Sequence, residues 1–234
     1  MIFEMRFYAV THGRTQDANA RFTGPLPALF ARHGVQCVGA WNALAGPGAP
    51  RFVYLLAYRD FAHREAAWAG FYTDPQWAKI RAETNAGHEM IEQHDLFFLK
   101  ANAAWQPHAS VPEAGTMQVH ELVLQQISPG QNPAVNEFLG ATYLPLLRQS
   151  GGHNLGIFDM ASGYGMPQLV MLHAWPDAAV WHRGRMAMEA AAPLREAFTA
   201  QRHKLGQPLF GRCEVNLLGP IAGVSIHPSL GRTA

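Results

Sequence analysis

The sequence has little cysteine, little excess charge and no long hydrophobic run. Its 234 residues include 2 Cys, 18 Lys and Arg, and 17 Asp and Glu, which gives a formal net charge of +1. A balanced charge provides no broad attraction to nucleic acid or to anionic lipid, so neither is an expected partner. No apolar run approaches the roughly 20 residues that span a bilayer, and the chain begins in strand-like sequence without a leader pattern. We therefore expect a cytoplasmic location.

Several catalytic signatures are also missing. The sequence has no Walker motif and no GxSxG elbow, which argues against nucleotide-dependent chemistry and serine hydrolysis. Cys37 and Cys213 form no CxxC pair and are expected to be buried, structural thiols, with a reactive cysteine as the alternative. The two histidines at 88 and 94 do not have the HExxH spacing of a helical zinc site, so no metal is expected. These absences leave the reaction, and whether the protein is an enzyme, open.

A repeat is the strongest positive feature of the sequence. The sequence aligns with itself at an offset of 117 residues without a gap. In this alignment, fourteen positions between 4 and 62 have the same residue type as their equivalents between 121 and 179. Ordinary composition would give about four coincidences over such a stretch. Turn glycines and apolar strand positions both stay in phase, which indicates a tandem duplication.

Each copy predicts the order strand, helix, strand, strand, helix, strand, which is the ferredoxin-like pattern. In the first copy the expected strands are residues 2–10, 35–42, 51–59 and 96–99, and the expected helices are residues 22–34, broken at its prolines, and 61–80. A sheet with helices on one face needs a cover for its other face. We therefore predict an α+β fold, with two tandem βαββαβ modules packed sheet to sheet as an intramolecular barrel.

The expected domain boundaries follow from the repeat. The first module takes residues 1–100 and the second takes residues 117–218. A segment rich in proline and glycine, residues 101–116, is the expected linker, and residues 219–234 are the expected tail. The chain would be a monomer that holds a pseudo-dimer, or a homo-oligomer of that unit.

Seven short segments of the first copy carry a resemblance to a known family. They are EMRFY at 4–8, LP at 26–27, HG at 33–34, VGAW at 38–41, VYLLAY at 53–58, RE at 64–65 and DPQW at 74–77. This ordered set resembles the NIPSNAP family and covers nearly all of the first copy. The resemblance implies the fold of the dimeric α+β barrel proteins, which include small monooxygenases and haem-binding enzymes. It does not imply a particular reaction.

Polar and aromatic residues on the strands of the first copy form the main candidate ligand site. By strand alternation these residues share one face, which we expect to point away from the helices and into the barrel: Glu4, Arg6, Tyr8, Cys37, Trp41, Tyr54 and Tyr58. A guanidinium held by a carboxylate among aromatic rings could orient a carboxylate, enolate or carbonyl oxygen. Alternatively, Glu4 and Arg6 form only a structural ion pair that seals the barrel.

The second copy differs at these positions, so its pocket should be chemically different. Val123 stands at the position of Arg6 and Gln125 at that of Tyr8. The candidate residues that remain are Glu121, His173 and Trp175. His173 could be a general base, an axial haem ligand or simply a satisfied core histidine. No cofactor is predicted, with haem as an open alternative.

Two functions from different classes are consistent with these features. The first is binding of a small organic ligand in the barrel interior, with cofactor-free oxidation or isomerisation as the associated chemistry. The second is a non-catalytic scaffold whose exposed surfaces bind partner proteins. A filled core without a cavity would favour the scaffold, whereas an open pocket of a few hundred Å³ would favour the ligand.

Overall fold

The computed structural model describes residues 1–105 and 115–224. The first half contains β1 (Ile2–Val10), α1 (Thr15–Thr23), α2 (Leu26–Arg32), β2 (Gln36–Ala45), β3 (Arg51–Tyr58), α3 (Phe61–Thr73), α4 (Pro75–Asn85) and β4 (Ile91–Ala101). The second half contains β5 (Val119–Ile127), α5 (Asn132–Phe138), the π-helix η2 (Leu139–Tyr143), α6 (Leu144–Gln149), β6 (His153–Ser162), β7 (Gln168–Trp175), α7 (Ala178–Ala190), α8 (Ala192–Leu205) and β8 (Phe210–Pro220). No helix among these residues is both long and apolar enough to cross a lipid bilayer.

The local sequence explains where the main helices begin. Asp60 accepts a hydrogen bond of 2.7 Å from the backbone N–H of His63 and so caps α3. Asp74 caps α4 in the same way and is followed by Pro75, a residue favoured in the first helical turn. The predicted break in the first helix also occurs, since α1 ends before Gly24 and α2 begins after Pro25. The fourth strand is longer than the predicted residues 96–99.

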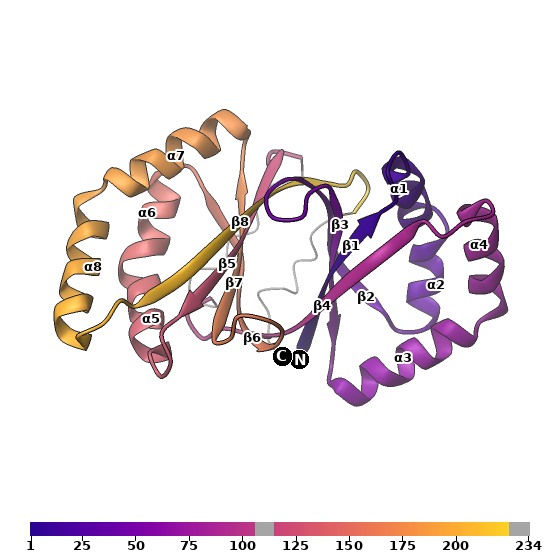
Figure 1. Cartoon of the computed structure of the whole chain (residues 1–234), viewed down its shortest axis with the longest axis horizontal. Coiled ribbons are helices and arrows are strands. Elements are labelled where there is room, and N and C mark those ends of the chain that lie inside the picture. Colours follow the sequence, from indigo (N-terminus) through magenta and orange to yellow (C-terminus); the bar gives the residue numbers. More distant parts are fainter. Residues whose placement is uncertain (106–114, 225–234) are drawn as a thin grey trace.

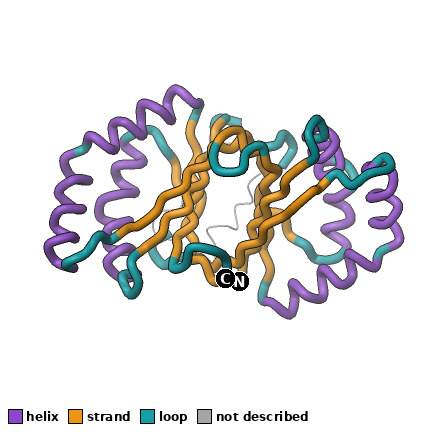
Figure 2. The backbone as a smooth tube through the Cα atoms, in the orientation of Figure 1, coloured by secondary structure: helices purple, strands orange, loops and turns teal. Residues whose placement is uncertain are grey.

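Eight antiparallel strands close into one barrel in the order β1-β3-β2-β8-β5-β7-β6-β4. The halves meet at two seams, where β2 pairs with β8 and β4 pairs with β6. The helices of the first half cover one side of the barrel and those of the second half cover the opposite side (Figures 1 and 2). The predicted α+β barrel of two ferredoxin-like halves is therefore confirmed.

The 117-residue offset relates β1 to β5, but it changes before the last strand of each half. Phe3 of β1 pairs with Leu99, whereas His120 of β5 pairs with Leu218. The last strands are thus offset by 119 residues, because α8 has 14 residues whereas α4 has 11. The domain boundaries and the duplication stay predictions, and the predicted linker and tail lie partly outside the described residues.

The inside of the barrel is packed with apolar side chains. Phe3 lies with its ring centroid 4.9 Å from that of Phe158, a contact between strands of different halves. Trp41 donates a hydrogen bond of 2.7 Å from Nε1 to Nδ1 of His120, again between the halves. Both tryptophan and histidine are buried. Within residues 1–105 and 115–224, these side chains form a packed core where the sequence suggested a ligand cavity.

The opposite face of each strand meets the helices. Arg6 lies over the ring of Trp68 from α3, with 4.0 Å between its Cζ atom and the ring centroid. Tyr54 packs against Phe22 from α1 at 5.2 Å between centroids. The prediction that Glu4, Arg6, Tyr8, Tyr54 and Tyr58 point into the barrel was therefore wrong. Two further residues were predicted to point into the barrel. Trp41 does so, while Cys37 packs with the cluster beneath the helices.

Candidate functional site

A buried ion pair lies between the sheet and the helices of the first half. Glu4 is fully buried, and its Oε1 atom lies 2.6 Å from Nη2 of Arg6 on the same strand. Its Oε2 atom accepts a hydrogen bond of 2.9 Å from Nε of Arg64 on α3. The pairing of Glu4 with Arg6 was predicted from the sequence. Arg64 was not, because it comes from a helix far along the chain.

The charges of this cluster stabilise one another. Burial alone would raise the pKa of Glu4, but the hydrogen bond from Arg64 and the charge of Arg6 outweigh it, so that the pKa is lowered. Burial also opposes the charge of Arg6, whereas the oxygens of Tyr54, Tyr8 and Glu4 raise its pKa. Both groups are therefore ionised at neutral pH.

Arg6 connects this ion pair to two tyrosines. Its Nη1 atom donates to the hydroxyl of Tyr8 at 2.9 Å and to that of Tyr54 at 3.4 Å. The Tyr54 hydroxyl in turn donates to that of Tyr8 at 2.7 Å. Burial raises the pKa of Tyr54 well above its ordinary value, which keeps this donor protonated. Tyr8 thus accepts two hydrogen bonds, and its own proton is left to donate.

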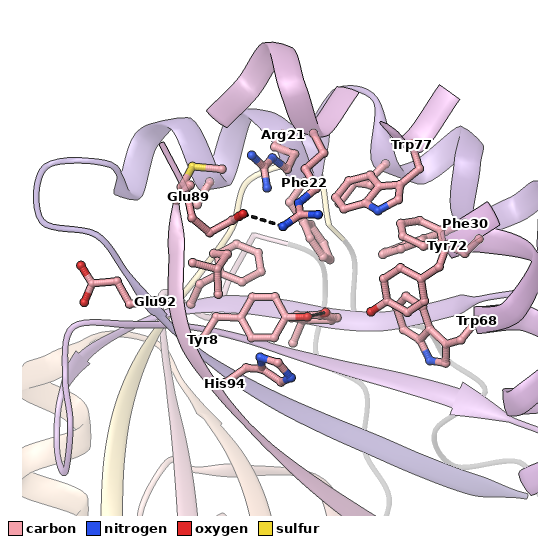
Figure 3. Close-up of a pocket in the computed structure, with 18 residues that line it drawn as sticks. Tyr8, Arg21, Phe22, Phe30, Trp68, Tyr72, Trp77, Glu89, Glu92 and His94 are labelled. Carbon is pink, nitrogen blue, oxygen red and sulfur yellow. Dashed lines mark hydrogen bonds and ion pairs between the residues drawn. The ribbon is translucent and has the colours of Figure 1, made fainter. Parts of the chain in front are cut away.

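Tyr8 faces a pocket of about 440 Å³ that lies beneath the helices of the first half (Figure 3). Half of the residues in its wall are Phe, Tyr or Trp, with several polar side chains among the rings. The residues that line it include Tyr8, Arg21, Phe22, Phe30, Phe52, Tyr54, Trp68, Phe71, Tyr72, Trp77, Arg81, Glu89, Glu92 and His94. The pocket volume is within the range of small-molecule sites.

The pocket has a polar group at each end and aromatic rings between them. In Figure 3, Tyr8 and His94 lie at one end, while Arg21 and Glu89 lie at the other. Glu89 is held by Arg81, with 2.6 Å between Oε2 and Nη2. An elongated, planar molecule with a polar group at one end or at both ends matches this distribution.

Glu121 lies at the equivalent position of the second half and has different partners. Its Oε2 atom is 3.2 Å from Nδ1 of His173 and accepts a hydrogen bond of 3.3 Å from Nε1 of Trp175. Its Oε1 atom accepts a hydrogen bond of 3.1 Å from Trp181 and lies 3.5 Å from Nε of Arg185. Burial would raise the pKa of Glu121, but His173 and Arg185 lower it to about 2. The structure thus brings Glu121, His173 and Trp175 together, as predicted, but under the helices.

The second half fills the region that corresponds to the pocket. Phe138 stands at the position of Arg21, and Phe198 stands at the position of Arg81. These two rings stack with their centroids 5.0 Å apart. Phe210 packs against Phe138 at 5.4 Å. Two arginines that line the first pocket are therefore replaced by packed aromatic rings in the second half.

The surroundings of His173 do not fit a haem. Its Nδ1 atom faces Glu121, and its Nε2 atom has no hydrogen-bond partner among the described residues. A histidine with one ring nitrogen held by a carboxylate and the other nitrogen unpaired could bind a haem iron. The side chain is nevertheless fully buried, and its ring packs 5.7 Å from that of Tyr143. It lines neither the large pocket nor a smaller one of about 190 Å³ beside Tyr164. No group of three His, Cys, Asp or Glu suited to a metal ion occurs within residues 1–105 and 115–224.

Of the nine predicted site residues only Tyr8 and Tyr54 line the pocket, and several residues that line it were missed. Trp41 lies inside the barrel, and Tyr58 is buried near Glu4 without lining the pocket. Many of the missed residues come from helices, where Arg21, Trp68 and Trp77 resemble ordinary amphipathic positions, and others, such as His94, come from β4. One usable signal was the spacing of Trp68, Phe71 and Tyr72, which puts aromatic rings on one helical face.

The closed barrel with a helical layer on each side defines an α+β barrel protein. A candidate monooxygenase from Lactobacillus acidophilus NCFM has this fold, with a TM-score of 0.59 and 9% identity over 94% of this chain and 94% of that chain. A candidate monooxygenase from Fusobacterium nucleatum gives 0.55 and 10% identity over 94% and 92%. Chlorite dismutase from Candidatus Nitrospira defluvii gives 0.55 and 7% identity over 95% and 93%. At such identities the likeness shows the fold alone.

Within this class, the first half of the chain is a NIPSNAP domain. The family model NIPSNAP matches residues 3–104, which include β1 to β4 and the pocket. The resemblance of the first copy is therefore confirmed, and a second such domain in residues 117–218 stays a prediction. Among curated proteins, none matches the sequence.

Proposed function

We propose that the NIPSNAP half binds a small, planar organic molecule in the pocket between its sheet and its helices. The observation that carries this proposal is the hydroxyl of Tyr8, which accepts hydrogen bonds from Arg6 and Tyr54 and can donate its proton into an aromatic pocket. The ligand would present an oxygen to Tyr8 and its apolar rings to Phe22, Trp68 and neighbouring aromatic side chains.

The same arrangement suits an oxygen that becomes negatively charged. A hydrogen bond from Tyr8, supported by the nearby cation of Arg6, favours an enolate or phenolate over its neutral form. Such anions are formed in isomerisation and in cofactor-free oxidation by dioxygen. A reaction of one of these two types is therefore the chemistry we propose.

The scaffold alternative has less support. Its expected sign, a filled barrel core, is present, since Trp41, Phe158 and their neighbours are fully buried. A scaffold, however, has no need for the 440 Å³ pocket or for a hydroxyl poised to donate into it. The core therefore serves stability, and the pocket favours ligand binding.

Replacing Tyr8 by Phe should weaken the binding of a hydroxyaromatic probe by about tenfold, because one hydrogen bond supported by a charge is lost. The measurement is a titration of the full chain with 2-naphthol, followed by naphthol fluorescence. Tyr164→Phe is the matched control, since Tyr164 lies outside this pocket. Equal affinity of the Tyr8→Phe and wild-type proteins would contradict the role of Tyr8, and no binding to either would contradict the proposed function.

A further inference from the structure

Arg21 is a buried cation on the wall of the pocket. It comes from α1 and is only 7% exposed. Its Nε atom donates to Oγ1 of Thr84 at 2.7 Å, and its Nη2 atom donates to Oδ1 of Asn85. Both acceptors are neutral. A guanidinium has five N–H donors in a planar fork, so the two contacts fix its position and leave further donors free.

No carboxylate pairs with Arg21 among the described residues. Two acidic residues on this side of the molecule pair with other arginines, Glu89 with Arg81 and Asp17 with Arg14. Burial lowers the pKa of Arg21, and the charges of Arg14 and Arg81 lower it further, although Glu89 acts in the opposite direction. Buried charges in proteins are usually paired, so a buried cation beside a cavity with no direct ion pair among the described residues needs an explanation.

The fold itself does not require a cation here. The equivalent position of the second half is Phe138, which packs in the corresponding helical layer against Phe198. The same backbone arrangement therefore accepts an apolar ring at this point. The charge of Arg21 is therefore specific to the first half, which is the half with the pocket.

We propose that the ligand of this pocket carries a carboxylate or a similar anionic group, which pairs with Arg21. This inference rests on the proposed function and narrows its ligand to an aromatic acid that also bears a hydroxyl or enolisable oxygen. The acid end lies at Arg21, the rings lie along Phe22 and Trp77, and the oxygen lies at Tyr8. Glu89 attracts Arg21 without forming an ion pair with it, so the anion supplies the direct partner, and a guanidinium binds a carboxylate with two parallel hydrogen bonds.

The test compares two probes that differ in one group. 2-Naphthol has only the hydroxyl, whereas 6-hydroxy-2-naphthoate adds a carboxylate on the far ring. We expect the wild-type full chain to bind the naphthoate at least tenfold more tightly than 2-naphthol. In Arg21→Gln this preference should disappear, because a single charged contact is worth tenfold or more.

Arg14→Gln is the matched control. Arg14 also ties the start of α1 to α4, through the backbone carbonyls of Thr84 and Asn85, but it does not line the pocket. It should keep the preference for the naphthoate. If Arg21→Gln does not fold, Arg21→Met tests the same point, because an apolar residue occupies the equivalent position of the second half.

The outcomes separate the two proposals. Binding of 2-naphthol without a gain from the carboxylate overturns the inference about Arg21 and leaves the proposed function standing. A preference that survives in Arg21→Gln or Arg21→Met also overturns it. Failure of both probes to bind the wild-type protein overturns the proposed function, and the inference with it.

Discussion

Replacing Glu4 by Gln should lower the free energy of unfolding by about 3–5 kcal/mol, which is the usual cost of removing one partner of a buried ion pair. The substitution keeps the size of the side chain but removes its charge. Arg6, which is only 3% exposed, would then lie beside Arg64 with no carboxylate between them. Urea denaturation of both proteins at pH 7, followed by far-ultraviolet circular dichroism, measures the difference.

Glu65→Gln provides a matched control for this prediction. Glu65 also pairs with Arg64, at 3.6 Å, but its side chain is 79% exposed. An exposed pair of this kind contributes no more than about 1 kcal/mol. If the two variants were equally stable, Glu4 would not be compensating buried charge, and the pairing with Arg6 would carry no weight in the fold.

The second large effect concerns pH and the histidine inside the barrel. Burial lowers the pKa of His120 from 6.5 to about 4. In the folded protein its Nδ1 atom accepts the hydrogen bond from Trp41, which a protonated ring could not do. Above pH 6.5 the ring is neutral in both states and its full contribution is present. As the pH falls towards 4, the unfolded chain binds a proton that the folded protein does not, so stability decreases by about 3 kcal/mol.

His120→Asn should remove this part of the pH dependence. Asn offers an oxygen acceptor near the position of Nδ1 but does not titrate. The measurement is the free energy of unfolding at several values between pH 7 and pH 4, for the wild type, His120→Asn and His182→Asn as an exposed control. The difference between the wild type and His120→Asn should shrink as the pH falls. A constant difference would mean that the folded barrel admits the protonated ring.

The order of elements could be predicted because its signals are local. Turn glycines, the caps Asp60 and Asp74, and the alternation of residues in β1 each act within a few positions of the chain. The repeat then suggested that two sheets cover one another. Closure of both sheets into a single barrel depends on pairing between strands of different halves, which are far apart in the sequence. It could still be predicted, because each sheet needs to bury the face that its helices do not cover.

The sequence of β1 alone does not show which face of the strand points into the barrel and which points towards the helices. Residues 2–7 are all buried, because the barrel core covers one face and the helices cover the other. Alternation separates Phe3 and Met5 from Glu4 and Arg6 but does not say which set faces the helices. The deciding contact is the one with Arg64, which supplies a second cation from α3 and leaves the apolar set to fill the dry interior.

The pocket could be predicted only in part, for a similar reason. The strand residues Tyr8 and Tyr54 were identified from alternation and from the resemblance. Arg21 was not, because its role depends on contacts with Thr84 and Asn85, 63 and 64 residues further along the chain. Within α1 it resembles any arginine in a last helical turn. Contacts of this range become visible only when the helices are placed over the sheet.

The joining of both halves of the barrel in one chain has a consequence for how such a protein can change. In a symmetric dimer of identical subunits, every substitution enters both sites at once, and a residue that helps one site must be tolerated by the other. Here each position occurs once per barrel. Arginine can therefore stand at residue 21 while phenylalanine stands at residue 138. One half can therefore keep an open pocket while the other packs aromatic rings at the corresponding positions.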